Sequence, residues 1–264
     1  MKKLFNRILL PVNMDRSAPL IVEKAISMAN EFRCDVHLLY NHVNAHTEKK
    51  INDLLEKCRQ RMGDGLYISG CLAKGAWFPS IKQYIITHRI DLVVIPRRTG
   101  NFFNYIDMNR LARETGCPVL SVTQNTDISQ LKNIVVPIND FLPVRKLTAA
   151  TYIARRFNAI IHLMGYNKNF RENEPGDSSW VSRAYQLLKD NTRLRIHRSP
   201  VYYGNGIAGN TLTYARQVEA DLIVVNPGKE SIYRGWPDRF FETIFYKKSH
   251  HIPVLIVARQ YLDE

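Results

Sequence analysis

The sequence has few of the patterns that mark membrane, disulfide-rich or metal-binding proteins. No apolar run approaches the roughly 18 residues that a membrane-spanning helix needs. The cysteines are scattered and form no CxxC pair, which argues against a zinc site or a disulfide framework; they are Cys34, Cys58, Cys71 and Cys117. Walker A, HExxH, nucleophile-elbow and deaminase signatures are also absent. We therefore expect no metal ion and no enzymatic activity.

Charge of one sign is not concentrated in any part of the chain. The 37 basic residues outnumber the 24 acidic ones and give a net charge of +13, which would suit an anionic partner. Residues 1–130 hold 18 basic and 12 acidic groups, and residues 131–264 hold 19 and 12. Because the excess is shared evenly and no basic tail exists, nucleic-acid binding ranks only third among the functions that the sequence allows.

The first residues, MKKLFNRILLPVNMD, carry the positive charge of a signal peptide but lack its long apolar stretch. The apolar run is short and is closed by Pro11, Asn13 and Asp15. We therefore expect a cytoplasmic protein that has no membrane partner.

The sequence repeats one pattern of short blocks, and its 264 residues suffice for two domains of ordinary size. Four blocks recur in the same order: RILLPVN (7–13) as NIVVPIN (133–139), AISMANEFRCDVHLL (25–39) as ATYIARRFNAIIHLM (150–164), DLVVIP (91–96) as DLIVVN (221–226), and CPVLSV (117–122) as IPVLIV (252–257). The polar stretch QNTDISQ near 124–131 reads as a linker. We predict two copies of one domain, at residues 1–124 and 131–264.

Within each copy, short apolar runs alternate with segments of helical period, which is typical of a parallel sheet with crossover helices. The expected strands are 8–12, 36–40, 66–71, 92–95 and 119–122 in the first copy, and 134–138, 160–164, a strand ending near 203, 222–225 and 254–257 in the second. The predicted fold class is α/β, with two tandem doubly wound domains, each a five-stranded parallel sheet with helices on both faces.

The order and spacing of these blocks resemble the universal stress protein family over most of the chain, and the duplication resembles a tandem member. The resemblance implies a stress-response or regulatory binding protein with strand order 3-2-1-4-5 in each copy. It also implies that any nucleotide lies at the carboxyl ends of strands one and four, where physics too would place a ligand. Fifth strands pair across dimers in this family, so the two copies should form an internal pseudo-dimer, and a further homodimer is possible; the protein partner is unknown.

The ATP-binding branch of that family has Pro-Val-Asp at the end of the first strand and a GxxGx9G loop after the fourth. Here the aspartate position is Asn13 or Asn139, and neither PRRTGNFFNYIDMNR (96–110) nor NPGKESIYRGWPDRF (226–240) fits the glycine pattern that lets backbone amides approach phosphates. The candidate ligand-binding residues are Pro11, Val12, Asn13, Val43, Pro96 and Arg97 in the first copy, and Pro137, Ile138, Asn139, Asn226, Pro227 and Gly228 in the second. Arg97, Arg98 and Lys229 could hold phosphates as side-chain cations, although solvated loop charges are the plainer interpretation.

The favoured hypothesis is a non-enzymatic tandem regulatory protein that has lost the ATP phosphate-binding loop. The alternative is that ATP or a related adenine nucleotide is the cofactor of at least one copy.

Three further signals have a structural and a functional interpretation. The string Gly204–Gly209 satisfies GxGxxG but follows a predicted edge strand, which favours a flexible loop over a dinucleotide site. His37 and His162 occupy matching positions, which favours a structural role, and His250 and His251 form a loop pair without partners at ligand spacing. The aromatic segment 233–246 reads as core or interdomain packing, with a base-stacking face as the alternative.

Overall fold

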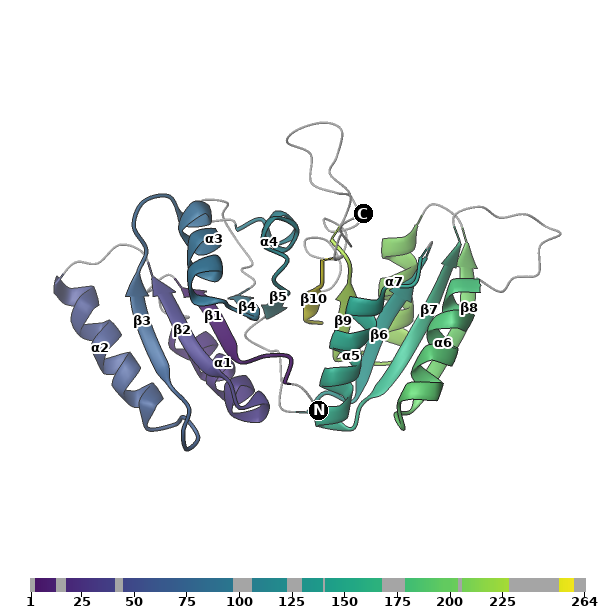
Figure 1. The fold of residues 1–264 in the computed structure, drawn as a ribbon, viewed down its shortest axis with the longest axis horizontal. Helices are drawn as coiled ribbons and strands as arrows, with labels where there is room; N and C mark the ends of the chain where they lie inside the picture. Colours follow the sequence, from purple (N-terminus) through teal and green to yellow (C-terminus); the bar gives the residue numbers. More distant parts are fainter. Residues whose placement is uncertain are drawn as a thin grey trace. The chain divides into compact units, whose positions relative to one another are not determined.

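The computed structural model of the chain describes residues 3–12, 18–40, 45–96, 106–122, 130–139, 141–167, 179–203, 206–227 and 252–258. The chain divides into two compact units, Met1–Ser129 and Gln130–Glu264, which we name unit 1 and unit 2. In each of them a twisted sheet is flanked by helices on both of its faces (Figure 1).

Unit 1 alternates strands and helices along its whole described length. Its elements are β1 (Arg7–Val12), α1 (Ala18–Phe32), β2 (Asp35–Tyr40), α2 (Ala45–Arg59), β3 (Ile68–Leu72), α3 (Trp77–His88), β4 (Leu92–Pro96), α4 (Met108–Thr115) and β5 (Val119–Val122). Unit 2 follows the same plan. Its elements are β6 (Asn133–Ile138), α5 (Val144–Phe157), β7 (Ile160–Asn167), α6 (Ser179–Asn191), β8 (Ile196–Tyr203), α7 (Ile207–Gln217), β9 (Leu222–Val225) and β10 (Val254–Ile256).

The strand order confirms the predicted fold class. In unit 1 the strands run β3-β2-β1-β4-β5, and in unit 2 they run β8-β7-β6-β9-β10, with every neighbouring pair in these two series parallel. Both series are the order 3-2-1-4-5 that the resemblance implies. Several strand boundaries differ by one or two residues from the expectation, and β7 continues three residues beyond the expected end, to Asn167.

The central strands lie in the core because both faces of a doubly wound sheet are covered. Residues 8–10 of β1 and 134–136 of β6 are fully buried, as the continuous apolar runs predict. The edge strand β3 is different, since only Ile68 among its residues is buried. Side chains alternate between the two faces of β3. A Cβ at Gly70 would approach Leu55 of α2, whereas the Ser69 side chain lies near Tyr84 of α3. Helices α2 and α3 therefore cover opposite faces.

Both units satisfy the amino-terminal edge of the sheet with an aspartate that precedes the fourth strand. Asp91 Oδ2 accepts hydrogen bonds from the amides of Asn6 and Arg7, at 2.9 and 3.1 Å. Asp221 Oδ2 accepts them from the amides of Lys132 and Asn133 in the same way, at 2.7 and 2.9 Å. Without the aspartate, these amides would lack a hydrogen-bond partner where the central strand begins. Each aspartate therefore joins the start of the fourth strand of its unit to the start of the first, and we name Asp91 and Asp221 the clamp aspartates.

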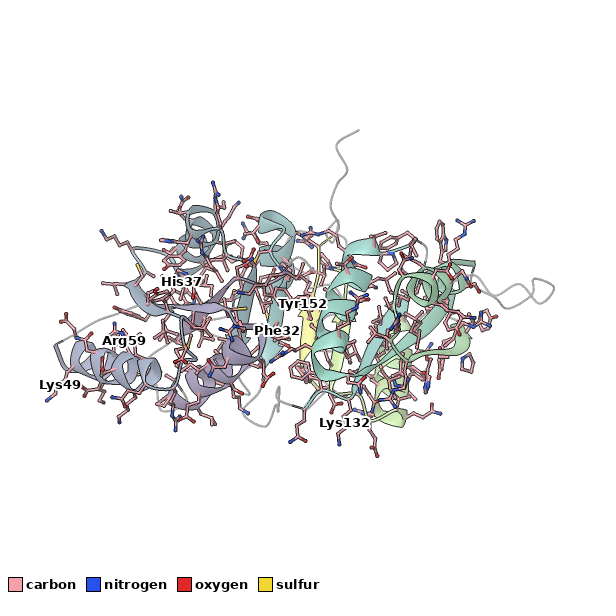
Figure 2. All side chains as sticks on the ribbon, turned by 60° about the horizontal axis from the view of Figure 1, so that its bottom comes forward. Phe32, His37, Lys49, Arg59, Lys132 and Tyr152 are labelled. Carbon is pink, nitrogen blue, oxygen red and sulfur yellow. The ribbon has the colours of Figure 1, made fainter. Side chains whose placement is uncertain are left out.

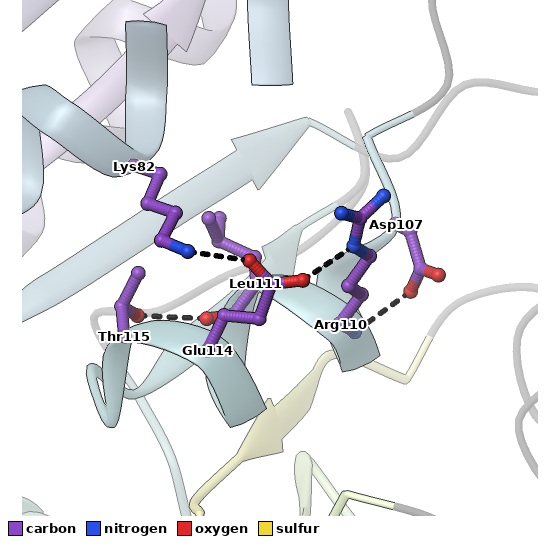
Figure 3. Close-up of polar contacts among 6 residues, drawn as sticks. All are labelled: Lys82, Asp107, Arg110, Leu111, Glu114 and Thr115. Carbon is purple, nitrogen blue, oxygen red and sulfur yellow. Dashed lines mark hydrogen bonds and ion pairs between the residues drawn. The ribbon is translucent and has the colours of Figure 1, made fainter. Parts of the chain in front are cut away.

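Helix α4 of unit 1 is held by polar contacts at both ends (Figure 3). Asp107 caps its amino terminus by accepting from the Arg110 amide at 2.8 Å, and Gly116 ends it with a left-handed φ of 67°. Glu114 Oε2 lies 2.7 Å from Lys82 Nζ of α3, and Glu114 Oε1 lies 2.6 Å from Arg110 Nε. These contacts join α4 to α3, the neighbouring helix in this unit.

Candidate functional site

The first candidate site in each unit is the switch point, where neighbouring strands part at their carboxyl ends. In unit 1, the pairing of β1 with β4 ends at Leu9, whereas the pairing of β1 with β2 continues as far as Val12. In unit 2, the pairing of β6 with β9 ends at Val135, whereas the pairing of β6 with β7 continues as far as Ile138. Beyond these pairs the ends of the strands face separate neighbours, which is the position where open α/β sheets hold ligands.

At the switch point of unit 1, the structure describes three of the candidate residues. Pro11 and Val12 are buried at the end of β1, and Pro96 is half-buried at the end of β4. The other candidates of this unit, Asn13, Val43 and Arg97, lie outside the described residues, as does Arg98. The described part of this site is therefore apolar.

At the switch point of unit 2, the described candidates include polar groups. Pro137 and Ile138 are buried at the end of β6, and Asn139, Asn226 and Pro227 are half-buried; Gly228 and Lys229 lie outside the described residues. The Asn226 side chain donates through Nδ2 to the Val257 carbonyl at 2.9 Å, while its Oδ1 is buried and has no hydrogen-bond partner among the described residues. A buried acceptor of this kind is favourable only when a donor from water or a ligand reaches it.

Two basic residues in the first turn of α5 complete the switch point of unit 2. Lys146 is only 2% exposed, and its Nζ donates to the carbonyl of Pro137. Arg145 donates through Nη1 to the Ala258 carbonyl at 3.3 Å. A buried ammonium is costly unless hydrogen bonds compensate it, so its presence beside the end of β6 points to a polar environment there.

Sequence reasoning did not find Lys146. The repeat aligns Ala25 with Ala150, so Lys146 stands where unit 1 has Ile21, a residue 3% exposed in the apolar stripe of α1. The available signal was this mismatch, a lysine at a position that helical periodicity assigns to the core.

The two matched histidines form hydrogen-bonded pairs with matched tyrosines. His37 Nδ1 of β2, labelled in Figure 2, lies 3.1 Å from Tyr84 Oη of α3 and 3.3 Å from Ser69 Oγ. In unit 2, Tyr214 Oη of α7 lies 3.4 Å from His162 Nδ1. Each histidine thus ties the second strand of its unit to the helix that follows the third strand.

The environment of the two histidines differs in electrostatic terms. His162 is 5% exposed, and its Nε2 lies 3.1 Å from Asn133 Oδ1. Burial, with a smaller effect of His197, lowers the pKa of His162 to about 4. Burial also lowers the pKa of His37, followed by the positive charges of His88 and Arg7. Both imidazoles are expected to be neutral at physiological pH, which suits a structural hydrogen bond.

The GxGxxG string does not form the fingerprint of a dinucleotide site in the residues that are described. Gly204 and Asn205 lie outside them, while Gly206 and Gly209 lie at the start of α7, next to the edge strand β8. A Cβ at Gly206 or at Gly209 would meet no atom within 4 Å. The close packing that makes glycine necessary in that fingerprint is therefore absent here.

The remaining sequence signals fall elsewhere. His250, His251 and the aromatic segment 233–246 lie outside the described residues. Among the residues with defined placement, no group of three His, Cys, Asp or Glu side chains could hold a metal ion. No helix within the described ranges is long and apolar enough to cross a membrane.

The strand order and the helices on both faces define a two-unit, doubly wound α/β protein. Solved structures with this architecture include universal stress proteins. A putative universal stress protein from Pseudomonas aeruginosa UCBPP-PA14 is 16% identical, with a TM-score of 0.73 over 97% of this chain and 94% of that one. A universal stress protein from Archaeoglobus fulgidus DSM 4304 is 14% identical, with a TM-score of 0.64 and 96% of each chain covered.

A protein of unknown function from Pseudomonas aeruginosa PAO1 is similarly close, at 18% identity and a TM-score of 0.73, with 97% of this chain and 94% of that chain covered. No protein-family model matches the sequence, and no curated protein matches it. At these identities, the likeness shows that the chain has the universal stress protein fold in both units.

Proposed function

We propose that the chain is a non-enzymatic, cytoplasmic regulatory protein of the tandem universal stress protein type, which responds to stress by binding a ligand or partner. The observation that carries this proposal is the composition of the switch point in unit 2. Lys146, Asn139 and Asn226 supply groups that hydrogen-bond or attract a ligand, with no nucleophile and base paired among the described residues around them. Such a site can bind a molecule without transforming it.

The proposal includes the loss of the ATP phosphate-binding loop. The sequence after β4 and after β9 departs from the glycine pattern, and asparagine replaces the aspartate at the end of the first strand of each unit. An asparagine keeps hydrogen-bonding capacity but loses the negative charge. The four cysteines, none of them in a disulfide, agree with a cytoplasmic location.

A second candidate function is adenine-nucleotide binding in unit 2. It is favoured by the buried acceptor Asn226 Oδ1, which a ligand amino or hydroxyl group could satisfy, and by the Lys146 ammonium, which could face a phosphate. The described part of the switch point in unit 1 offers no such pair of groups. If a nucleotide binds, we therefore expect a stoichiometry of one per chain.

Titration of the full chain with Mg-ATP by calorimetry at physiological salt separates the two functions. The first predicts no saturable heat up to millimolar ATP. The second predicts saturable binding near one site per chain, which the Asn226→Ala and Lys146→Met variants weaken. Ile21→Met is the matched control in unit 1, and it should leave any binding unchanged.

Two further predictions from the sequence can be tested with the same material. Nucleic-acid binding through the basic surface requires retention of DNA or RNA at about 50 mM salt that falls steeply as salt rises. The association of the two units as a pseudo-dimer through their fifth strands, and any further homodimer, stay predictions, which cross-linking and sedimentation can check.

A further inference from the structure

A pocket in unit 1, away from the switch point, lies between α3 and the outer strands β2 and β3. Its volume is about 460 Å³, within the range of small-molecule sites. Its lining comes from β2, from β3 and the turn after it, and from one face of α3: Leu39, Cys71, Leu72, Ala73, Lys74, Ala76, Pro79, Ser80, Gln83, Tyr84, Thr87 and His88. We name it the β3–α3 pocket.

The pocket exists because β3 presents small side chains to α3. Cys71 lines the pocket, Ser69 lies on the same face of β3, and both residues are exposed. In unit 2 the residue paired with His162 is His197, where unit 1 pairs His37 with Ser69. The rings of His162 and His197 are 5.1 Å apart, so an aromatic side chain occupies in unit 2 a position that is small in unit 1.

The charged groups around the β3–α3 pocket favour an anion. Lys74 lines it, and none of the described residues that line it is acidic. The first turn of α3 also lines it through Ala76 and Pro79, and the Ala76 cap makes no side-chain hydrogen bond to this turn. The turn after β3 brings Lys74 to this helix end because Gly75 adopts a φ of +83°. A lysine and the amino terminus of a helix both stabilise negative charge.

The rest of the lining favours an apolar, flat molecule. Leu39 forms part of the wall on the strand side, and Tyr84 and His88 form the wall on the α3 side. The rings of Tyr84 and His88 are stacked with centroids 4.0 Å apart. Stacked rings give a planar surface on which an aromatic ligand can pack.

We propose that the β3–α3 pocket binds a small organic anion, a carboxylate attached to a flat apolar body. The carboxylate lies near Lys74 and the start of α3, and the body packs against Leu39 and the Tyr84 wall. The site is separate from the switch points, so it can be present whether or not ATP binds to unit 2.

Cys71 provides a reporter inside the pocket. It is exposed, whereas Cys34, Cys58 and Cys117 are buried. Burial raises the pKa of Cys34 to about 12 and also raises the pKa of Cys58, which makes both thiols slow to react. Alkylation of the folded full chain by iodoacetamide, followed by peptide mass spectrometry, therefore measures access to Cys71. The Cys71→Ser variant should lose the fast-reacting thiol.

The test uses 2-naphthoate as the probe and the neutral 2-naphthamide as its matched control. Rates with and without probe are compared within each variant, because a change near the thiol can alter its own reactivity. We expect 2-naphthoate to slow alkylation of Cys71 in a saturable way and 2-naphthamide to need about tenfold higher concentration. Lys74→Gln should weaken protection by 2-naphthoate about tenfold, whereas Lys57→Gln, on α2 outside the pocket, should leave it unchanged.

Three results would overturn the proposal. The first is the absence of protection by 2-naphthoate at about 5 mM, a concentration that would detect even millimolar affinity. The second is equal protection by the acid and the amide, which would remove the assignment of an anion. The third is equal weakening by Lys74→Gln and Lys57→Gln, which would show a general charge effect. None of these results depends on the ATP titration, so the two proposals fail separately.

Discussion

Unit 1 and unit 2 use the same frame but fill it with different side chains. The clamp aspartates Asp91 and Asp221 accept hydrogen bonds from an equivalent pair of backbone amides in each unit. The first helix ends in both units with a left-handed residue, Arg33 or Asn158, at φ of 56° and 53°. The two units thus share contacts that satisfy the backbone, in addition to the matched hydrogen bonds between histidine and tyrosine side chains.

The differences between the units lie in the side chains at matching positions of this frame. The first helix of each unit carries Ile21 or Lys146 at the matching position, and the edge strand carries Ser69 or His197 beside the matched histidine. The first change places a buried ammonium in unit 2, and the second places an aromatic ring beside the matched histidine. The comparison indicates that the frame of this fold constrains a few polar contacts strongly and leaves the lining of its sites free to vary.

The largest expected effect comes from moving the lysine of unit 2 into unit 1. Ile21→Lys buries an ammonium in an apolar stripe, and we expect it to destabilise unit 1 by about 3–5 kcal/mol, the cost typical of a buried charge without a partner. Hydrogen exchange with mass spectrometry on the full chain measures this loss separately for each unit.

The reverse change tests whether unit 2 has built a compensating environment for its lysine. Lys146→Met keeps the size of the side chain but removes the donor to the Pro137 carbonyl, so we expect a cost of about 1–2 kcal/mol, below that of Ile21→Lys. Equal losses for Ile21→Lys and Lys146→Met would contradict the view that the two positions differ in environment.

The order of strands and helices could largely be predicted, because it follows from local sequence patterns that occur in both units. Apolar runs such as 8–12 and 134–138 have no amphipathic period, and only a central parallel strand explains them in this context. The boundaries were less certain at the edges. β7 extends to Asn167 past Gly165, where a register shift in its pairing with β8 occurs, and such a shift depends on the neighbouring strand.

The sites could be predicted less well, because they depend on contacts between distant elements. The sequence indicates Asn226 by its place after β9, but its hydrogen bond to the Val257 carbonyl depends on a strand about 30 residues further along the chain. The β3–α3 pocket was not predicted at all. Its signal, the small residues of β3, has meaning only once α3 is known to lie over that face.

The next effect concerns the pH dependence of the two histidines. The pKa of His162 is about 4 in the folded chain against an ordinary value of 6.5, so the unfolded chain binds a proton first as the pH falls. The stability that neutral His162 contributes is complete above about pH 6.5 and is lost progressively down to about pH 4, by up to about 3 kcal/mol.

Urea unfolding of the full chain at pH 7.5 and 4.5 measures this dependence. His162→Gln should remove a large part of the loss, whereas His37→Gln should remove less, because His37 is only half-buried. If the two variants changed the pH dependence equally, the contrast between the histidine environments would be wrong.

For the two clamp aspartates we expect equal losses of stability, in contrast to the two histidines. Asp91→Ala and Asp221→Ala each remove an acceptor from two backbone amides, and each should destabilise its own unit by about 2 kcal/mol. Local hydrogen exchange in β1 and in β6 reports the two losses. A difference well above about 1 kcal/mol would mean that the two clamps are not equivalent, despite their matching geometry.

The smallest effect is expected at Lys82, where the units diverge on the helix after the third strand. Counting back from Asp91 and Asp221, Lys82 of α3 corresponds to Leu212 of α7, which is buried. Lys82 is 39% exposed and pairs with Glu114, so Lys82→Ala should cost below about 1 kcal/mol, and less in high salt. Leu212→Ala is the matched change in unit 2, and it should cost about 2–5 kcal/mol through lost burial.

The pH dependence of the Lys82 effect gives its control. Hydrogen bonds from Lys82 and Arg110 lower the pKa of Glu114, so the contribution of this carboxylate is present above its ordinary pKa and is lost as the pH falls through the lowered value. The cost of Lys82→Ala should therefore shrink in acid, while that of Leu212→Ala should not, because no charge is involved. A cost of Lys82→Ala that stayed constant from pH 7 to pH 3 would assign its effect to packing of the lysine stem on α4 and would remove the ion pair as its cause.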